Sequence, residues 1–222
     1  MAASQATPLR QVRERELVKA TRALFDERGL QDAPIEEIAK NVGIARGLIY
    51  RHFSSKEELY VLTMTDYLAE LDGVLRAAIS SRGDPVAQLE RTADAYARFC
   101  LRYPAFLDCA LSLMRRPARE LQEVVSGSVW LRLGQGMANC VDQLAELLRA
   151  GNEAGVFEVE DPDFMASALW TQILGLTHLA RIGAGVRQRS PGLPELFEID
   201  SEQIVRTGVS SAMATVGVRE RP

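Results

Sequence analysis

The stretch IEEIAKNVGIARGLIYRHFSSKEEL, residues 35–59, decides the fold of this chain. Apolar residues recur there at i, i+3, i+4 and i+7: Ile35, Ile38, Ala39 and Val42. This spacing places them on one face of a two-turn helix, expected over residues 34–42. Gly43 follows at once, and another short helix is expected over residues 45–53. Two short helices joined by a tight turn that carries a glycine are typical of the helix-turn-helix motif.

The second of these helices has one face suited to a core and one suited to a groove. A helix turns by about 100° per residue, so Ile49 and Phe53 lie about 40° apart and both fit the core. The opposite face then carries Gly47, Tyr50 and Arg51, flanked by Arg46 and Leu48. Arginine can donate two hydrogen bonds to guanine, and leucine can contact a thymine methyl group. This face therefore has the chemistry to read the major groove of DNA.

The spacing of this motif extends further than a generic helical corner. An Ile-Ala-x-x-x-Gly segment over residues 38–43 precedes Gly-x-x-Tyr-x-x-Phe-x-x-Lys from Gly47 to Lys56. This combination resembles the DNA-binding domain of the TetR family of bacterial transcriptional regulators. The resemblance covers about residues 12–60. It implies a homodimer that binds operator DNA and releases it when a small molecule enters a variable C-terminal domain.

Eight positions are the candidate DNA-binding residues: Ala45, Arg46, Gly47, Leu48, Tyr50, Arg51, His52 and Lys56. Arg46 is the expected base reader, whereas Tyr50, His52 and Lys56 can donate to phosphates, which fix the register. Ala45 and Leu48 replace hydroxyl residues that are common in the family, so one phosphate contact is missing. His52 also fits a structural histidine, and Arg51 also fits a solvated surface charge.

The rest of the chain predicts an all-α fold with few strand signals. Helices are expected over residues 12–28, 56–79, 85–102, 104–114, 163–182 and 201–216, and residues 117–149 are expected to be mostly helical. Glycine, proline and arginine dominate residues 183–200, which are expected to form a loop. Residues 164–180 carry no charge, but the stretch is short and dotted with polar residues. A membrane span needs about 20 predominantly apolar residues, so a buried helix is expected instead.

We expect two domains, a DNA-binding domain over residues 12–60 and a helical domain over residues 61–218 for ligand binding and dimerisation. The 163–182 helix is apolar nearly all round, so one chain cannot cover it on every side. The last helix offers small residues for close packing: Gly208, Ser211, Ala212 and Thr215. A two-fold interface of these two helices from each copy is expected. A monomer with a central helix is the alternative.

A ligand pocket should be mostly apolar with a few polar groups. The candidate ligand-binding residues are Tyr96, Phe99, Tyr103, Phe106, Met114, Trp130, Leu133, Met137, Trp170 and His178. Each of them also fits a plain core position. The expected effector is an apolar or aromatic small molecule that lowers operator affinity. A helical interaction protein and a constitutive regulator without an inducer are the alternative functions.

Composition excludes several other classes. The three cysteines and two histidines have neither disulfide nor zinc spacing, and no catalytic triad or phosphate loop is evident. We therefore expect no enzyme, no cofactor and no metal. The start lacks a secretory signal, which favours a cytoplasmic protein without membrane association. Residues 1–56 hold ten basic and seven acidic residues, net +3, in a chain of net charge −4. A positively charged N-terminal segment is suited to binding DNA.

Overall fold

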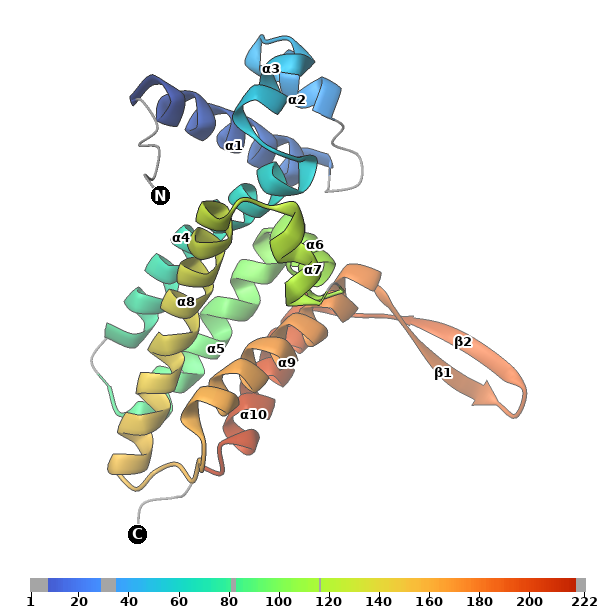
Figure 1. Cartoon of the computed structure of the whole chain (residues 1–222). Helices are drawn as coiled ribbons and strands as arrows, with labels where there is room; N and C mark the ends of the chain where they lie inside the picture. The colour runs from blue at the N-terminus through green and yellow to red at the C-terminus, as the bar shows by residue number, and fades with distance from the viewer. Residues whose placement is uncertain (1–7, 29–34, 81–82, 116, 219–222) are drawn as a thin grey trace. The chain divides into compact units, whose positions relative to one another are not determined.

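The computed structural model describes residues 8–28, 35–80, 83–115 and 117–218 (Figure 1). The helices are α1 Pro8–Arg28, α2 Ile35–Val42, α3 Arg46–His52, α4 Lys56–Ser80, α5 Pro85–Arg102, α6 Pro104–Met114, α7 Ala118–Val124, α8 Gly127–Glu153, α9 Pro162–Ile182 and α10 Ser201–Thr215. Two strands, β1 Ala184–Ser190 and β2 Leu193–Glu198, lie between α9 and α10. The expected helical fold with an N-terminal helix-turn-helix is confirmed. The expected start of α2 at Pro34 lies outside the described residues.

Several helix ends follow from capping chemistry. Asp84, Asp161 and Asp200 each accept hydrogen bonds from the first-turn N–H groups of α5, α9 and α10. These side chains satisfy donors that have no partner within the helix. Gly183 ends α9 with φ +74°, a left-handed conformation that favours glycine.

The chain divides into two compact units. The first unit comprises Met1–Ala69 and Asp108–Gly136, and the second comprises Glu70–Leu107 and Met137–Pro222. In the first unit, α1, α2 and α3 pack on one another. Their shared core contains fully buried Leu17, Phe25, Ile38, Ile49 and Phe53.

In the second unit, α5, α9 and α10 form a mutually packed set. The buried side of α9 carries Ala166, Leu169, Trp170, Ile173, Leu174 and Thr177. Gly208 of α10 is also buried, and a Cβ atom there would lie 3.9 Å from side-chain atoms of Ile173 and Leu176. At Gly208, α10 therefore packs closely against α9 of the same chain.

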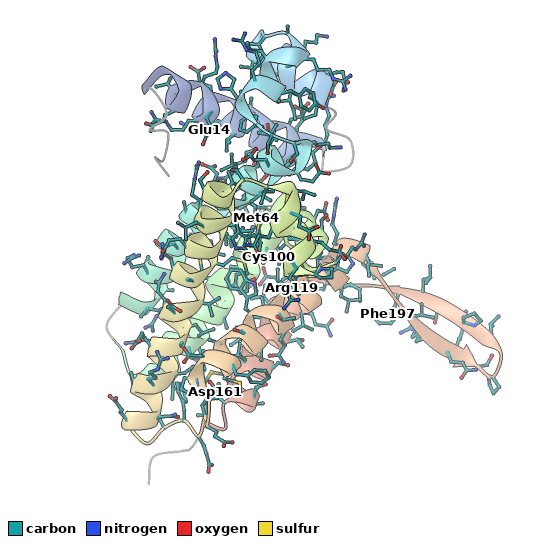
Figure 2. The ribbon with its side chains drawn as sticks, in the orientation of Figure 1. Glu14, Met64, Cys100, Arg119, Asp161 and Phe197 are labelled. Carbon is teal, nitrogen blue, oxygen red and sulfur yellow. The ribbon has the colours of Figure 1, made fainter. Side chains whose placement is uncertain are left out.

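The expectation of a loop over residues 183–200 is wrong, because this segment forms an antiparallel hairpin. Gly192 lies at the turn with φ +80° directly after Pro191, the arrangement typical of a type II turn. Val186 pairs with Leu196 and Arg187 with Glu195, where an ion pair joins the two strands at 2.9 Å. Phe197 lies on this hairpin, labelled in Figure 2, and its ring fills the space where Gly185 lacks a Cβ.

Within the described segments, no helix is both long enough and apolar enough to cross a membrane. The charge-free stretch at 164–180 instead forms most of α9, with one side buried.

Candidate nucleic-acid interface

The seven-residue helix α3 is too short to be stable alone and depends on two anchors. Ile49 and Phe53 are each 1% exposed, and both belong to the core of the first unit. Arg46, Gly47, Tyr50 and Arg51 are exposed on the other side. The sequence predicted both faces of α3, and the burial pattern agrees with this division.

The turn between α2 and α3 requires its glycine. Gly43 has φ +69°, and its N–H donates to the Lys40 carbonyl at 3.0 Å. The N–H of Ile44 donates to the Ala39 carbonyl at 2.9 Å. These bonds close the end of α2 and fix the direction in which α3 starts.

Arg46 is held by a partner on α2 that the sequence did not suggest. Its Nη1 lies 2.5 Å from the Glu36 carboxylate, and its guanidinium lies 5.8 Å from the centre of the Tyr50 ring. Hydrogen bonding to Tyr50, followed by the charge of Glu36, raises the pKa of Arg46. Both side chains of the ion pair are more than half exposed, so Arg46 can exchange Glu36 for another acceptor at low cost.

The remaining candidates lie around this face. Ala45 is the N-cap of α3 and supplies no side-chain cap, because alanine has no hydroxyl group. Leu48 and His52 are half-buried, and Nδ1 of His52 is shielded from solvent. Lys56 is exposed in the first turn of α4, with its ammonium 5.0 Å from the centre of the Tyr60 ring.

A buried carboxylate at the junction of α3 and α4 also escaped the sequence analysis. Glu58 is 5% exposed and accepts hydrogen bonds from the N–H and hydroxyl of Ser54 and from the hydroxyl of Ser126. Burial raises the pKa of Glu58, but the bonds from Ser126 and Ser54 outweigh it, so the net pKa is lowered. Glu58 therefore joins the link after α3 to the segment before α8, inside the first unit.

Ser55 strengthens the same junction. Its hydroxyl accepts the N–H of Glu58 at 3.0 Å, which makes Ser55 the N-cap of α4. The hydroxyl also donates to the carbonyl of Val124, at the end of α7, at 2.9 Å. A glutamate stands three residues after each of Ser54 and Ser55, so either serine has the spacing of a cap, and the structure shows Ser55 in this role.

Comparison with known proteins adds independent evidence. A sequence model described as bacterial regulatory proteins of the tetR family matches residues 17–62, which include α2, α3 and the start of α4. This segment belongs to the TetR family. The HTH-type transcriptional repressor KstR2 of Mycobacterium tuberculosis is 35% identical over 78 residues, which are 35% of this chain and 39% of that repressor. The match thus spans about two fifths of that relative's length.

Solved structures show that the likeness in fold extends to nearly the whole chain. RolR in complex with resorcinol has a TM-score of 0.68 at 17% identity and covers 96% of this chain and 92% of its own. The ketosteroid transcriptional regulator KstR2 of Mycobacterium tuberculosis has a TM-score of 0.61 at 20% identity, covering 99% and 100%. Membership of a family of regulatory proteins also agrees with the expectation that the chain is not an enzyme.

Two of the ten candidate ligand residues, Tyr96 and Trp170, line a common cavity. Tyr96 stacks on Trp170 in the second unit, with ring centres 4.5 Å apart and planes inclined by 27°. They line a cavity of about 20 Å³ whose other walls are mostly apolar. The buried hydroxyl of Tyr96 has no hydrogen-bond partner, and burial raises its pKa.

The other candidates occupy different surroundings. Phe99 packs against Tyr103 and Phe106, with ring centres 4.9 and 5.2 Å away, which is a core cluster of the second unit. Met114 and Met137 are 53% and 40% exposed. Leu133 is buried and Trp130 half-buried in the first unit. His178 is half-buried, with Nδ1 shielded and unpartnered.

The cysteines do not form a reactive site among the described residues. Cys100, Cys109 and Cys140 are all buried and free, and burial raises the pKa of each to about 12. At neutral pH they are thiols, which are weak nucleophiles and weak metal ligands.

Proposed function

We propose that this TetR-family chain is a transcriptional repressor that binds a palindromic operator as a homodimer, with residues 12–60 as the DNA-binding domain. The outward face of α3 carries this proposal, because Ile49 and Phe53 hold exposed Arg46, Gly47, Tyr50 and Arg51 on one side. The repressor name of the relative KstR2 supports the direction of regulation.

In the proposed complex, Arg46 releases Glu36 and donates two hydrogen bonds to a guanine in the major groove. Gly47 lets the backbone approach the groove, and Leu48 contacts a thymine methyl group. Tyr50, His52 and Lys56 contact phosphates and fix the register.

Selection of bound duplexes from a random pool tests this function. We expect a palindrome with half-sites about 10 base pairs apart or more. Lys56→Ala should weaken binding to every sequence alike and reduce the salt slope by about one charge. Equal affinity for the selected and a scrambled duplex would contradict sequence-specific binding.

Dimerisation is supported by the uncovered side of α9. Phe164 is 70% exposed, Ile182 is 60% exposed and Leu179 is 36% exposed, all on a helix that the second unit buries on its other side. Four small residues of α10 were expected at the dimer interface, but two of them, Gly208 and Ala212, are buried within the chain. The part of α10 that can contact a second copy is therefore smaller than the sequence suggested. Light scattering should give about twice the 24.5 kDa of one chain. A stable mass of one chain at micromolar concentration would contradict the dimer.

An apolar or aromatic effector is the proposed means of control. The Tyr96 hydroxyl supports it, because a ligand acceptor would satisfy a donor that is now buried without a partner. RolR, which shares the fold, was solved with resorcinol. A ligand at this cavity must widen it, since about 20 Å³ holds only about one water molecule. That small volume favours the alternative of a constitutive regulator.

Screening distinguishes these two functions. Compounds that raise the melting temperature of the protein are then tested for release of the selected operator. The factor by which a compound weakens operator binding must equal the factor by which the operator weakens binding of that compound. Release by one compound supports induction. A complete screen without release supports the constitutive regulator.

A further inference from the structure

A cleft of about 220 Å³ lies in the first unit, between the first turns of α4, the end of α6 and α7. It is separate from the Tyr96 cavity, which belongs to the second unit. Its lining includes Lys56, Glu57, Tyr60, Ser112, Leu113 and Leu121.

The polar side of this cleft carries opposite charges that are not paired with each other. Within the described residues, neither Lys56 nor Glu57 forms a salt bridge, and the ammonium of Lys56 instead lies over the Tyr60 ring. Ser112 adds a hydroxyl group, and Leu113 and Leu121 add apolar surface. The lining thus offers one charged donor, one charged acceptor and an apolar wall, with no net charge.

A ligand that fits this lining is neutral, has a ring for the apolar wall, and carries a group that both donates and accepts. A phenolic hydroxyl does both, because it donates to a carboxylate and accepts from an ammonium. The volume agrees, since a cavity of about 150 Å³ holds benzene and drug-sized ligands need about 300 Å³ or more. We propose that the α4–α6–α7 cleft binds a single-ring phenol, with its hydroxyl between Lys56 and Glu57.

The regulatory consequence rests on the proposed DNA binding, whereas the ligand site itself does not. Lys56 is one of the three proposed phosphate contacts. A phenol that holds the Lys56 ammonium in the cleft therefore removes one contact with DNA. The wall of the cleft is also tied to the recognition helix, because Ser55, in the link after α3, bonds to Val124 at the end of α7. Phenol and operator therefore bind antagonistically, by the same factor in each direction.

Ligand-observed NMR on the DNA-free protein tests the site with phenol, toluene and benzoate as probes. Phenol should bind about tenfold more tightly than toluene, which lacks the hydroxyl, and than benzoate, which can accept from Lys56 but has no donor for Glu57 and is repelled by it. Leu113→Trp fills the cleft and should abolish phenol binding. Leu131→Trp is the matched control, since Leu131 is 70% exposed in the same unit and does not line the cleft.

Glu57→Gln provides a second variant that leaves the apolar packing intact, and it should weaken phenol binding several-fold. Retained phenol binding in both Leu113→Trp and Glu57→Gln overturns the site, as does equal binding of the three probes. Operator anisotropy is then measured with phenol for the wild type and Leu113→Trp. Release only from the wild type supports the antagonism. Phenol binding without release overturns the antagonism alone, and absence of any operator binding overturns the proposed function while the NMR result still decides the site.

Discussion

Replacement of Glu58 by glutamine tests how the recognition helix is attached to its unit. The buried carboxylate accepts three hydrogen bonds, two from Ser54 and one from Ser126. Glutamine keeps one oxygen acceptor but turns the other into an NH2 donor, so the Ser126 hydroxyl must rotate and accept. Each remaining bond is then a neutral one.

The magnitude follows from the difference between charged and neutral hydrogen bonds. A bond to a charged group contributes about 1.5–3 kcal/mol and a neutral one about 0.5–1.5 kcal/mol, so three contacts lose about 3 kcal/mol. Removing a buried charge offsets part of this loss. We expect Glu58→Gln to lower the free energy of unfolding by about 2 kcal/mol at pH 7.

The stability lost in Glu58→Gln should become smaller as the pH falls. The folded pKa of Glu58 is lowered, so its contribution is complete above the ordinary value of about 4.3 and fades as pH falls through the folded pKa. Urea unfolding of the wild type and Glu58→Gln at pH 7 and pH 3 measures this. The gap should shrink at pH 3, because this pH lies below the ordinary pKa of glutamate, where the unfolded wild-type chain already binds the proton and the contribution of Glu58 fades.

Glu57→Gln is the matched control for stability, because Glu57 is half-exposed and makes no salt bridge within the described residues. It should change the free energy of unfolding by less than about 0.5 kcal/mol. The reasoning is refuted if Glu58→Gln is as stable as this control at pH 7, or if its deficit is the same at pH 3.

Three further outcomes are expected. Gly43→Ala should lower the free energy of unfolding by about 1–2 kcal/mol in urea titrations, since φ is +69° but no atom lies within 4 Å of the added Cβ; an unchanged midpoint would contradict the strain. Glu36→Gln should tighten operator binding in anisotropy assays, because Arg46 no longer leaves an ion pair and one charge that repels phosphate is gone; weaker binding would mean that Glu36 positions Arg46 for DNA. Phe164→Asp should shift the dimer towards monomer by light scattering, whereas Leu131→Asp on the first unit should not; equal masses would place the interface elsewhere.

Helices with periodic faces and proline or aspartate boundaries were predictable from sequence. Residues 85–102 and 104–114 have the expected bounds, because Asp84, Pro85 and Pro104 act locally. The division of α3 into buried and exposed faces was equally accessible, since it depends only on helical geometry.

Features that depend on distant partners were not predictable. The hairpin over residues 184–198 depends on pairing between Val186 and Leu196, and its glycine and proline content suggested a loop. The Glu36–Arg46 ion pair joins two helices, and the Glu58–Ser126 bond joins α4 to the link before α8; no local spacing reveals either. Met137 has helical spacing to buried Leu133 and Cys140, yet it is 40% exposed, which local spacing also does not reveal.

The base preference of Arg46→Ala tests the central claim most directly, because this claim assigns sequence reading to the exposed face of α3. The selected duplex is varied one base pair at a time, and the affinities of wild type, Arg46→Ala and the control Arg76→Ala are compared. Arg76 is also an exposed, ion-paired arginine, on α4. The account predicts that Arg46→Ala loses about 1–3 kcal/mol and its preference at one guanine of each half-site, while Arg76→Ala keeps the full profile. An unchanged profile for Arg46→Ala would contradict the claim.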